Sequence, residues 1–568
     1  MPYRMFLGQV AERIRLTYDG LPNHYEGAAQ LLADLQLAAD SLSANRGRNG
    51  GLFPVERLIR RVRSFGFHLA TLDVRQHASV HRAVVGQGLG DAEWANRSAD
   101  ERAAVLRDAL ARDRGPVVQF DAVGRRTLSV FDAMVQGRVR YGAYAVGDYV
   151  ISATQGIDDV LSVLLLARWA DVVDKSTGEV PFNFAPLFES VDSLAAAPEV
   201  MRAVFDEPAY ARHLASRQHR QIVMVGYSDS NKESGIAASR FAVHQAQDAL
   251  IEVCRERRVE LALFHGRGDA ASRGGSRVES LVRSAPPGAV RRLLRVTEQG
   301  EGVNNNYGLA QIAMRTFEQA FHQLAIATAA ADAGIRRPEE GRYLECMGTV
   351  ARASRARYRG LVLESAGFFD YFRAVTPIDV IERMQIGSRP AYRDGRMSLE
   401  SLHAVPWVFA WTQSRHLLPG WFGIGTGLGE AAREHGAERL ATMWSNWEFF
   451  SLLIDDVELE LAKVDLGIAA LYDELAPAGV RGFAEEIARE HALACRWLTW
   501  LKGEVDLLDS QARMQRSVML RSPYLDPIHL MQVDLLRRWR QGGREDDGLF
   551  RALLGSITGV AQGLQSSG

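Results

Sequence analysis

Apolar residues in the first 300 positions fall in short runs that are separated by longer stretches of helical spacing. The runs are rich in β-branched and aromatic residues, which is typical of strands. Six strands are predicted: HLATLDV (68–74), YVISAT (149–154), FAPLF (184–188), QIVMVGY (221–227), ELALF (260–264) and LLRVT (293–297). Because they alternate with helical patterns, they favour βα units and a parallel sheet or barrel.

The spacing of apolar residues changes after about residue 305. Seven residues then share one helical face, and helical patterns continue to the end of the chain: Leu309, Ile312, Thr316, Phe317, Ala320, Phe321 and Leu324. We therefore expect an α/β part over residues 1–305 and an all-α part over residues 306–568. Six strands are two fewer than a (β/α)₈ barrel needs, so sheet edges are expected to stay unpaired.

The Trp- and Phe-rich run 403–428 is interpreted mainly as core packing.

Composition narrows the class of protein. A chain of 568 residues with 47% hydrophobic composition can bury a large core. The 67 Lys and Arg residues nearly balance 69 Asp and Glu residues, so nucleic acid and membranes are not expected partners, and any anion site must be local. No apolar run reaches the roughly 18 to 20 residues of a membrane span, and the N-terminus has no signal-peptide pattern. Three scattered cysteines without a CxxC pair fit a reducing compartment, so a cytoplasmic location is expected.

Polar residues follow the predicted strands, where parallel barrels keep their active sites. They are Arg75, Glu189, Asp229, His265 and Glu298. One polar residue at one strand end is weak support, because strand ends reach solvent anyway. Five around one rim favour a shared site.

Glu189 and Asp229 are hard oxygen donors that come from different strands. Such donors suit Mg²⁺ or Mn²⁺ bound together with waters and a substrate phosphate. The alternative is a pair of solvated carboxylates, and for the pair taken alone this alternative is favoured, since no linear spacing marks a divalent oxygen site.

The segment FHGRGDAASRGGSR (264–277) places Arg267 and Arg273 between glycines. Backbone amides and two guanidinium groups can close on an oxyanion there, although a glycine-rich surface loop has the same composition. Lys232, in GYSDSNKESG, precedes a predicted helix whose N-terminus attracts anions. His265 by itself would more often be a structural histidine, so its interest comes from its neighbours.

Eight motifs occur in the order found in phosphoenolpyruvate carboxylases: LDVRQ (72–76), PLFES (186–190), VGYSDSNKESG (225–235), LFHGRG (263–268), SRGGS (272–276), LRVTEQGE (294–301), GSRPA (387–391) and VPWVFAWTQSR (405–415). The chain resembles the C-terminal two-thirds of that family over essentially its whole length. The resemblance implies a (β/α)₈ barrel with extra helices, usually a homotetramer. It also implies a carbon–carbon lyase that uses Mg²⁺ or Mn²⁺ to form oxaloacetate and phosphate from phosphoenolpyruvate and bicarbonate. That reaction is anaplerotic carbon fixation for the tricarboxylic acid cycle.

The resemblance also assigns roles to individual residues. It implies that residues 1–305 carry the metal and phosphate site, and that residues 306–568 complete it and add effector and oligomer contacts. The metal ligands would be Glu189 and Asp229. Arg75, Arg267 and Arg389 would bind the substrate phosphate, and Lys232 would bind bicarbonate. His265 would be an active-site histidine, and Arg273 would close the glycine loop over the site. An inhibitory dicarboxylate would bind at Lys463, Arg521 and Arg273.

The sequence departs from the family pattern at three places. The family's histidine-proline-threonine motif does not occur, and we expect it to belong with the two missing strands to an N-terminal segment. Asp269 adds a negative charge to the glycine loop, and Ser566 stands where the family has an asparagine in the inhibitor pocket. Two alternatives therefore stay open. One is a non-catalytic or split subunit that needs a separate N-terminal chain, and the other is a repurposed phosphoenolpyruvate phosphatase or oxaloacetate decarboxylase.

Overall fold

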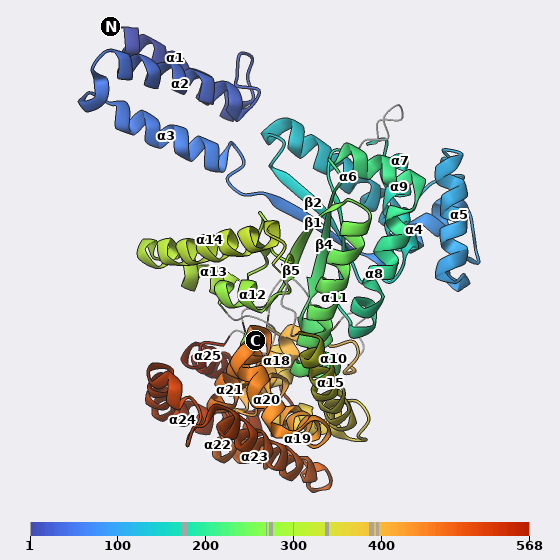
Figure 1. Ribbon diagram of the computed structural model, residues 1–568, viewed down its shortest axis with the longest axis vertical. Coiled ribbons are helices and arrows are strands. Elements are labelled where there is room, and N and C mark those ends of the chain that lie inside the picture. The colour runs from blue at the N-terminus through green and yellow to red at the C-terminus, as the bar shows by residue number, and fades with distance from the viewer. Residues whose placement is uncertain are drawn as a thin grey trace. The chain divides into compact units, whose positions relative to one another are not determined.

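The structure is a computed structural model that describes residues 2–172, 180–268, 270–271, 277–298, 300–335, 340–384, 391–392 and 397–566. The chain is mostly helical (Figure 1). Its strands form one parallel sheet in the order β1-β2-β3-β4-β5-β6. The strands are β1 (Leu72–His77), β2 (Val146–Ser152), β3 (Phe184–Phe188), β4 (Arg220–Gly226), β5 (Glu260–Gly266) and β6 (Arg295–Val296).

All six predicted strands are therefore present, but only β3 has the predicted bounds at both ends. The differences at β1 and β6 have a clear backbone cause. β1 begins at Leu72 and not at residue 68, because Leu69 has a φ of 64° and the chain turns there before it can extend. β6 is reduced to two residues, which pair with Phe264 and His265 of β5. The left-handed φ of 60° at Arg292 breaks the extended chain just before it.

Contacts divide the chain into two compact units. The first unit comprises residues 1–186 and 200–222, and the second comprises residues 187–199 and 223–568. This division follows packing, and the functional division predicted at residue 305 stays a prediction. Each unit is described separately below.

The first unit begins with three helices that share a small core of their own, and a series of βα elements follows. The three helices are α1 (Pro2–Asp19), α2 (Ala28–Ala44) and α3 (Leu52–Phe65). The later helices are α4 (Ala78–Leu89), α5 (Ala99–Ala111), α6 (Ala122–Tyr141), α7 (Ile157–Trp169) and α9 (Pro208–Ser216). Helix α7 is almost entirely buried and packs against α4, α5 and α6.

The second unit carries the C-terminal ends of β3 and β4, all of β5 and β6, and helices around and after them. The helices up to residue 332 are α10 (Ser228–Ser234), α11 (Ile236–Glu256), α12 (Val278–Ser284), α13 (Gly300–Tyr307) and α14 (Ala310–Asp332). Helix α8 (Val191–Phe205) begins in this unit.

The rest of the second unit confirms the predicted helical region. The helices are α15 (Glu340–Val362), α16 (Phe368–Val375), α17 (Ile378–Ile381), α18 (Ala404–Gln413), α19 (Ile424–His435), α20 (Ala437–Asn446), α21 (Glu448–Lys463), α22 (Leu466–Asp473), α23 (Gly482–Lys502), α24 (Ala512–Gln541) and α25 (Asp547–Leu564). Among the described residues after β6, β pairing is limited to the isolated bridge between Tyr392 and Leu402.

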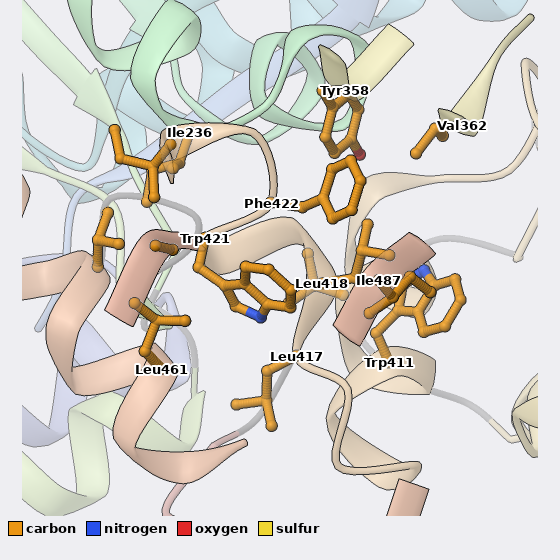
Figure 2. Packing of buried hydrophobic residues seen from close by; sticks show 14 of the residues in the cluster. Ile236, Tyr358, Val362, Trp411, Leu417, Leu418, Trp421, Phe422, Leu461 and Ile487 are labelled. Atoms are coloured by element: carbon orange, nitrogen blue, oxygen red, sulfur yellow. The ribbon is translucent and has the colours of Figure 1, made fainter. Parts of the chain in front are cut away.

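The aromatic run at 403–428 forms the core of the second unit, as predicted. Trp407 and Trp411 stand one turn apart on α18 and meet edge to face, with ring centroids 5.6 Å apart. Figure 2 shows Trp411 and Trp421 among buried aliphatic and aromatic side chains from several helices. Truncating one such Trp to Ala typically costs about 3–5 kcal/mol, so this run anchors the helices that surround the site.

Helix α14 is present where the apolar spacing predicts it, but none of its described residues is buried. Phe317 is 61% exposed and Phe321 is 73% exposed. A large apolar face of this kind usually marks a contact surface. Among the described helices, none is both long enough and apolar enough to cross a bilayer.

Candidate active site

Two glycines let the carboxyl ends of β3, β4 and β5 approach one another closely. A Cβ atom added to Gly226, the last residue of β4, would lie 2.6 Å from the Cβ atom of Glu189. A Cβ atom added to Gly266, the last residue of β5, would lie 2.8 Å from Cε of Met224 and 3.2 Å from the carbonyl oxygen of Val225. Real Cβ atoms do not come within 3.0 Å of another residue's Cβ, so Gly226 requires glycine, whereas a Cβ at Gly266 would need the end of the Met224 side chain to move and the backbone of Val225 to shift slightly. The predicted polar residues that follow these strands are therefore gathered at one edge.

Glu189 follows β3 directly, and Asp229 lies in the first turn of α10, directly beyond β4. Both residues are half-buried. The loop that carries Glu189 is fixed because the hydroxyl of Ser193 accepts hydrogen bonds from the N–H groups of Glu189 (3.1 Å) and Ser190 (3.0 Å).

This carboxylate pair fits a hard divalent cation better than a softer metal. In the described part of the chain, no cluster of three or more His, Cys, Asp and Glu side chains is arranged for a metal. Mg²⁺ commonly binds one or two carboxylates and takes its remaining ligands from waters and substrate oxygens. Glu189 and Asp229 supply the number and type of protein ligands that such an ion takes, and their role as its ligands stays a prediction.

His265 lies near the end of β5 and is 1% exposed. The hydroxyl of Tyr227 lies 3.2 Å from its Nδ1, and Nε2 of Gln247 donates to the same hydroxyl at 3.3 Å. Burial first, and the nearby charge of Arg267 second, lower the pKa of His265 to about 3. The ring is therefore neutral near pH 7. If Tyr227 donates to Nδ1, the ring proton is held on Nε2.

Arg267 follows β5 and is 6% exposed. Its carbonyl oxygen accepts a hydrogen bond from Thr297 Oγ1 at 3.0 Å, which fixes the backbone beside β6. In the described structure its Nη1 is buried without a hydrogen-bond partner. Burial is the main cause that lowers the pKa of this guanidinium group, and the neighbouring charge of Arg240 adds to it. A buried guanidinium nitrogen without a partner favours a bound anion because an anion supplies the missing hydrogen bond.

Arg267 lines a cavity of about 910 Å³ in the second unit, called the Arg267 cavity below. Most of its other lining residues are polar, and they come from the start of α12, from β6 and the segment after it, from α14, and from α25 and the residues that follow it. They include Glu298, Asn304, Asn306, Arg315, Gln562 and Ser566. A cavity of this size can hold a small metabolite together with water.

An ion pair between Arg240 and Asp456 lies close to Arg267. Arg240 of α11 donates to Oδ2 of Asp456 on α21 at 2.7 Å and to the carbonyl oxygen of Ala271 at 2.9 Å. Burial raises the pKa of Asp456, and Arg240 and Arg267 oppose that rise. The pair therefore ties the start of the glycine-rich loop to the helical region.

Lys232 is buried in the second half of α10 and precedes the long helix α11, as the sequence predicted. Its ammonium group donates to the carbonyl oxygens of Leu402 (2.6 Å) and Glu400 (3.3 Å). This contact holds α10 against the segment before α18. The structure does not test the bicarbonate role of Lys232.

The structure connects the segments of Lys463 and Arg521, two of the three predicted effector residues, through another basic residue, Arg415. Nε of Arg415 donates to the carbonyl oxygen of Lys463 at 3.0 Å, and its Nη2 donates to Ser522 Oγ at 3.4 Å, next to Arg521. Arg521 in turn donates to the carbonyl oxygen of Gly563 on α25 at 3.1 Å. Arg415 is 2% exposed, and the sequence analysis did not identify it.

Three other predicted site residues, Arg273, Arg389 and Arg75, are not among the residues described above. Arg273 and Arg389 lie outside the described residues, as does Asp269. Arg75 belongs to the first unit, where it is exposed within β1 and aligned with Val150 of β2.

Sequence reasoning missed Tyr227, Gln247, Arg240 and Asp456. Tyr227 stands inside the motif VGYSDSNKESG, and its position directly after a strand is the same signal that identified Asp229. The other three lie within long helices, where nothing in their local sequence separates them from ordinary surface residues.

Comparison with known proteins gives one family over nearly the whole chain. A family model described as phosphoenolpyruvate carboxylase matches residues 2–568. The chain is 43% identical over 570 residues to a phosphoenolpyruvate carboxylase of Xanthomonas campestris pv. campestris (strain 8004), covering all of this chain and 62% of that protein. It is 36% identical to the enzyme of Azoarcus sp. (strain BH72), covering all of this chain and 64% of that protein. For the enzyme of Rhodothermus marinus the identity is 37%, over 90% of this chain and 57% of that protein.

The chain thus spans about three-fifths of the length of these curated relatives. The match nevertheless runs through nearly every residue of the chain, including the strand ends that carry Glu189, Asp229 and His265. The chain therefore belongs to the phosphoenolpyruvate carboxylase family.

Proposed function

We propose that this chain carries the catalytic part of a phosphoenolpyruvate carboxylase, which forms oxaloacetate and phosphate from phosphoenolpyruvate and bicarbonate. The observation that supports this most is the buried guanidinium group of Arg267. It lines a large cavity, and its charge lies close to the neutral ring of His265. The relatives reported above, which are 36–43% identical to this chain, are named phosphoenolpyruvate carboxylase. The proposal includes the expected cytoplasmic location and a homotetrameric assembly.

Glu189 and Asp229 would hold Mg²⁺ or Mn²⁺ with one carboxylate each. When bound, the ion supplies positive charge that offsets the negative charge developing on the substrate's oxygens. The closeness of Gly226 to Glu189 supports this assignment, because it fixes one carboxylate beside the strand that leads to the other.

Arg267 binds the phosphate of phosphoenolpyruvate in this proposal, with Arg75, Arg273 and Arg389 as further phosphate contacts. A planar guanidinium group can donate two parallel hydrogen bonds to a phosphate, and the burial of Arg267 strengthens them. Arg273 also closes the glycine-rich loop over the site and keeps water from the enolate.

His265 acts as a neutral hydrogen-bond donor beside the reacting carbon dioxide and carboxylate. Tyr227 and Gln247 orient its ring, and a neutral ring does not itself add a positive charge that would trap a product carboxylate. Lys232 helps to seat bicarbonate from its position at the end of α10. Lys463, Arg521 and Arg273 bind an inhibitory dicarboxylate, with Ser566 in place of the family's asparagine.

The fold proposed for the working enzyme is a (β/α)₈-type barrel. The six strands run in sequence order from β1 to β6, which leaves these two strands at the sheet edges. Two further strands, supplied by a separate N-terminal segment or chain, would pair with those edges. The exposed apolar residues of α14 are available for that contact or for a tetramer contact.

Oxaloacetate formation tests the function directly. The chain is assayed with phosphoenolpyruvate, bicarbonate and Mg²⁺ through coupled reduction of oxaloacetate by malate dehydrogenase, and phosphate release is followed in the same sample. Equal amounts of both products, abolished in Arg267→Gln but kept in Arg489→Gln, support the carboxylase. Phosphate without oxaloacetate indicates the repurposed phosphatase, and a folded chain that forms neither contradicts catalysis by this chain alone.

A further inference from the structure

Arg240 of α11 contacts three separate segments of the second unit. Its Nη2 donates to Oδ2 of Asp456 on α21 at 2.7 Å and to the carbonyl oxygen of Ala271 at 2.9 Å. Its Cζ lies over the ring of Tyr227, 6.0 Å from the ring centroid, where a guanidinium group is attracted to the face of the ring. The function proposed above gives neither Arg240 nor Asp456 a role.

Two of these contacts lead to residues of the proposed active site. Ala271 lies four residues after Arg267, so its hydrogen bond to Arg240 limits how far the segment after β5 can shift. The hydroxyl of Tyr227 lies 3.2 Å from Nδ1 of His265. One guanidinium group therefore touches both the segment that follows Arg267 and the ring that orients His265.

Asp456 holds Arg240 in the position that these contacts require. The side chains of both residues are 13% exposed, and a guanidinium group with so little access to water needs a negative charge beside it. Burial raises the pKa of Asp456, and the charge of Arg240 is the main cause that opposes this rise. Asp456 leaves the neighbouring Arg267 available, because Nη1 of Arg267 is without a hydrogen-bond partner in the described structure.

The pair is not needed to join the two helices that carry it. The rings of His244 on α11 and Phe449 on α21 lie with their centroids 4.4 Å apart, and the ring of Phe241 lies 6.5 Å from that of Phe449. These contacts already pack α11 against α21. A buried ion pair seldom adds much stability, because removing two charges from water costs about as much as their attraction returns. The position of the pair beside the site therefore indicates a second role.

We propose that the Arg240–Asp456 pair positions two residues of the active site, Arg267 and His265. Arg240 acts on Arg267 through the backbone of Ala271, and it acts on His265 through the ring of Tyr227. Asp456 keeps Arg240 in place. This inference rests on the proposed function, since it uses the roles given there to Arg267 and His265. Displacing an active-site group by about 1 Å can lower a rate about 100-fold, so such a pair can be important without touching the substrate.

Replacing the pair with apolar residues separates positioning from stability. The double variant Arg240→Met, Asp456→Leu removes both charges and keeps similar side-chain volumes, so its urea midpoint should be unchanged or higher. It loses the contacts to Ala271 and Tyr227, so kcat/KM for phosphoenolpyruvate should fall about tenfold or more in the coupled assay. Arg240→Lys keeps the charge without the planar fork and should give an intermediate value. Full activity in the double variant would overturn the proposal.

Arg102→Gln is the matched control for Arg240→Gln. In the first unit, Arg102 donates to Oδ2 of Asp158 at 2.7 Å and to the carbonyl oxygen of Arg97, and the side chains of this ion pair are 10% and 1% exposed. Both single variants leave a buried carboxylate without its partner, so both should lower the urea midpoint. Only Arg240→Gln should lower kcat/KM. An equal loss of kcat/KM in the two variants would show that the loss follows stability and not positioning.

Hydrogen–deuterium exchange gives a readout that requires no turnover. In the double variant, peptides over residues 264–271 should exchange severalfold faster than in the unaltered chain, and peptides over residues 99–111 should exchange at the same rate. Unchanged exchange over residues 264–271 would overturn the positioning role, whatever the activity. If the unaltered chain forms no oxaloacetate, the proposed function fails, and the exchange comparison alone still decides whether the pair holds the segment after β5.

Discussion

The hydroxyl of Tyr227 lies 3.2 Å from Nδ1 of His265, and both residues are almost fully buried where β4 and β5 end. Gln247 donates to that hydroxyl from α11. Burial raises the pKa of Tyr227, so the phenol keeps its proton and can donate it to the ring. These three residues fix the orientation of a histidine that belongs to the proposed active site.

Replacing Tyr227 with Phe is expected to lower kcat for oxaloacetate formation while leaving the KM for phosphoenolpyruvate nearly unchanged. The variant loses the hydrogen bond to His265 and leaves Gln247 without its partner, which should also cost about 1–2 kcal/mol of stability. Stability is measured by urea unfolding and activity by the coupled assay.

Tyr210→Phe is the matched control for this change, because the buried hydroxyl of Tyr210 donates to Gln221 at 2.7 Å in the first unit. Both variants should lose similar stability, but only Tyr227→Phe should lose turnover. A Tyr227→Phe enzyme with unchanged kcat would show that the hydroxyl does not orient His265.

Acid should destabilise the protein from about pH 6.5 downward. Burial lowers the pKa to about 3 in four histidines: His81, His213, His265 and His529. Above pH 6.5 these histidines are neutral in both the folded and the unfolded chain, so they add no pH dependence. Below it the unfolded chain binds protons that the folded chain excludes, so each histidine removes about 1.4 kcal/mol of stability per pH unit.

Urea unfolding at pH 7.0, 6.0 and 5.5 measures this slope. His529→Gln should make the slope shallower by the contribution of one histidine, even if the variant is less stable at every pH. The exposed His219→Gln should leave the slope unchanged. Parallel curves for all three proteins would contradict the role of buried histidines in acid sensitivity.

The local sequence predicted strands best where the whole run is buried. FAPLF matches β3 at both ends because all five residues are buried and polar residues follow directly. β1 was placed too early because the left-handed backbone at Leu69 has no strong signal in a leucine. Helix α14 was predicted from its apolar spacing, yet the same spacing gives no information about whether a partner covers that face.

The residues of the candidate site also fall into those that the local sequence predicts and those that it does not. Glu189, Asp229 and His265 were predictable because a strand end is a local feature and the parallel sheet gathers such ends. The pairing of Arg240 with Asp456 joins residues 216 positions apart, and Lys232 meets Leu402 from 170 positions away. Such contacts depend on how the helices of the second unit pack on the strands, which local periodicity does not encode.

Gly226→Ala is expected to destabilise the chain by about 1–3 kcal/mol and to reduce activity strongly. The new methyl group would lie 2.6 Å from Cβ and 3.0 Å from Cα of Glu189, so the backbone after β3 must shift. Gly555→Ala on α25 is the control, because no atom lies within 4 Å of its added Cβ, and there the change should be neutral or slightly stabilising. Thermal unfolding and the coupled assay measure both effects. Equal behaviour of the two variants would contradict the close packing of β3 against β4.

Mn²⁺ binding should depend on both Glu189 and Asp229. The ion is detected by electron paramagnetic resonance of free Mn²⁺, which requires no turnover. Each of Glu189→Gln and Asp229→Asn should weaken binding about tenfold or more, because each change removes a charged oxygen ligand from a site that has two. Glu485→Gln, whose parent side chain is 82% exposed on α23, is the matched control and should bind Mn²⁺ as the unaltered chain does.

Unchanged Mn²⁺ affinity in both site variants, with folding confirmed by circular dichroism, would show that these carboxylates do not hold the metal. In that case they would be solvated strand-end groups.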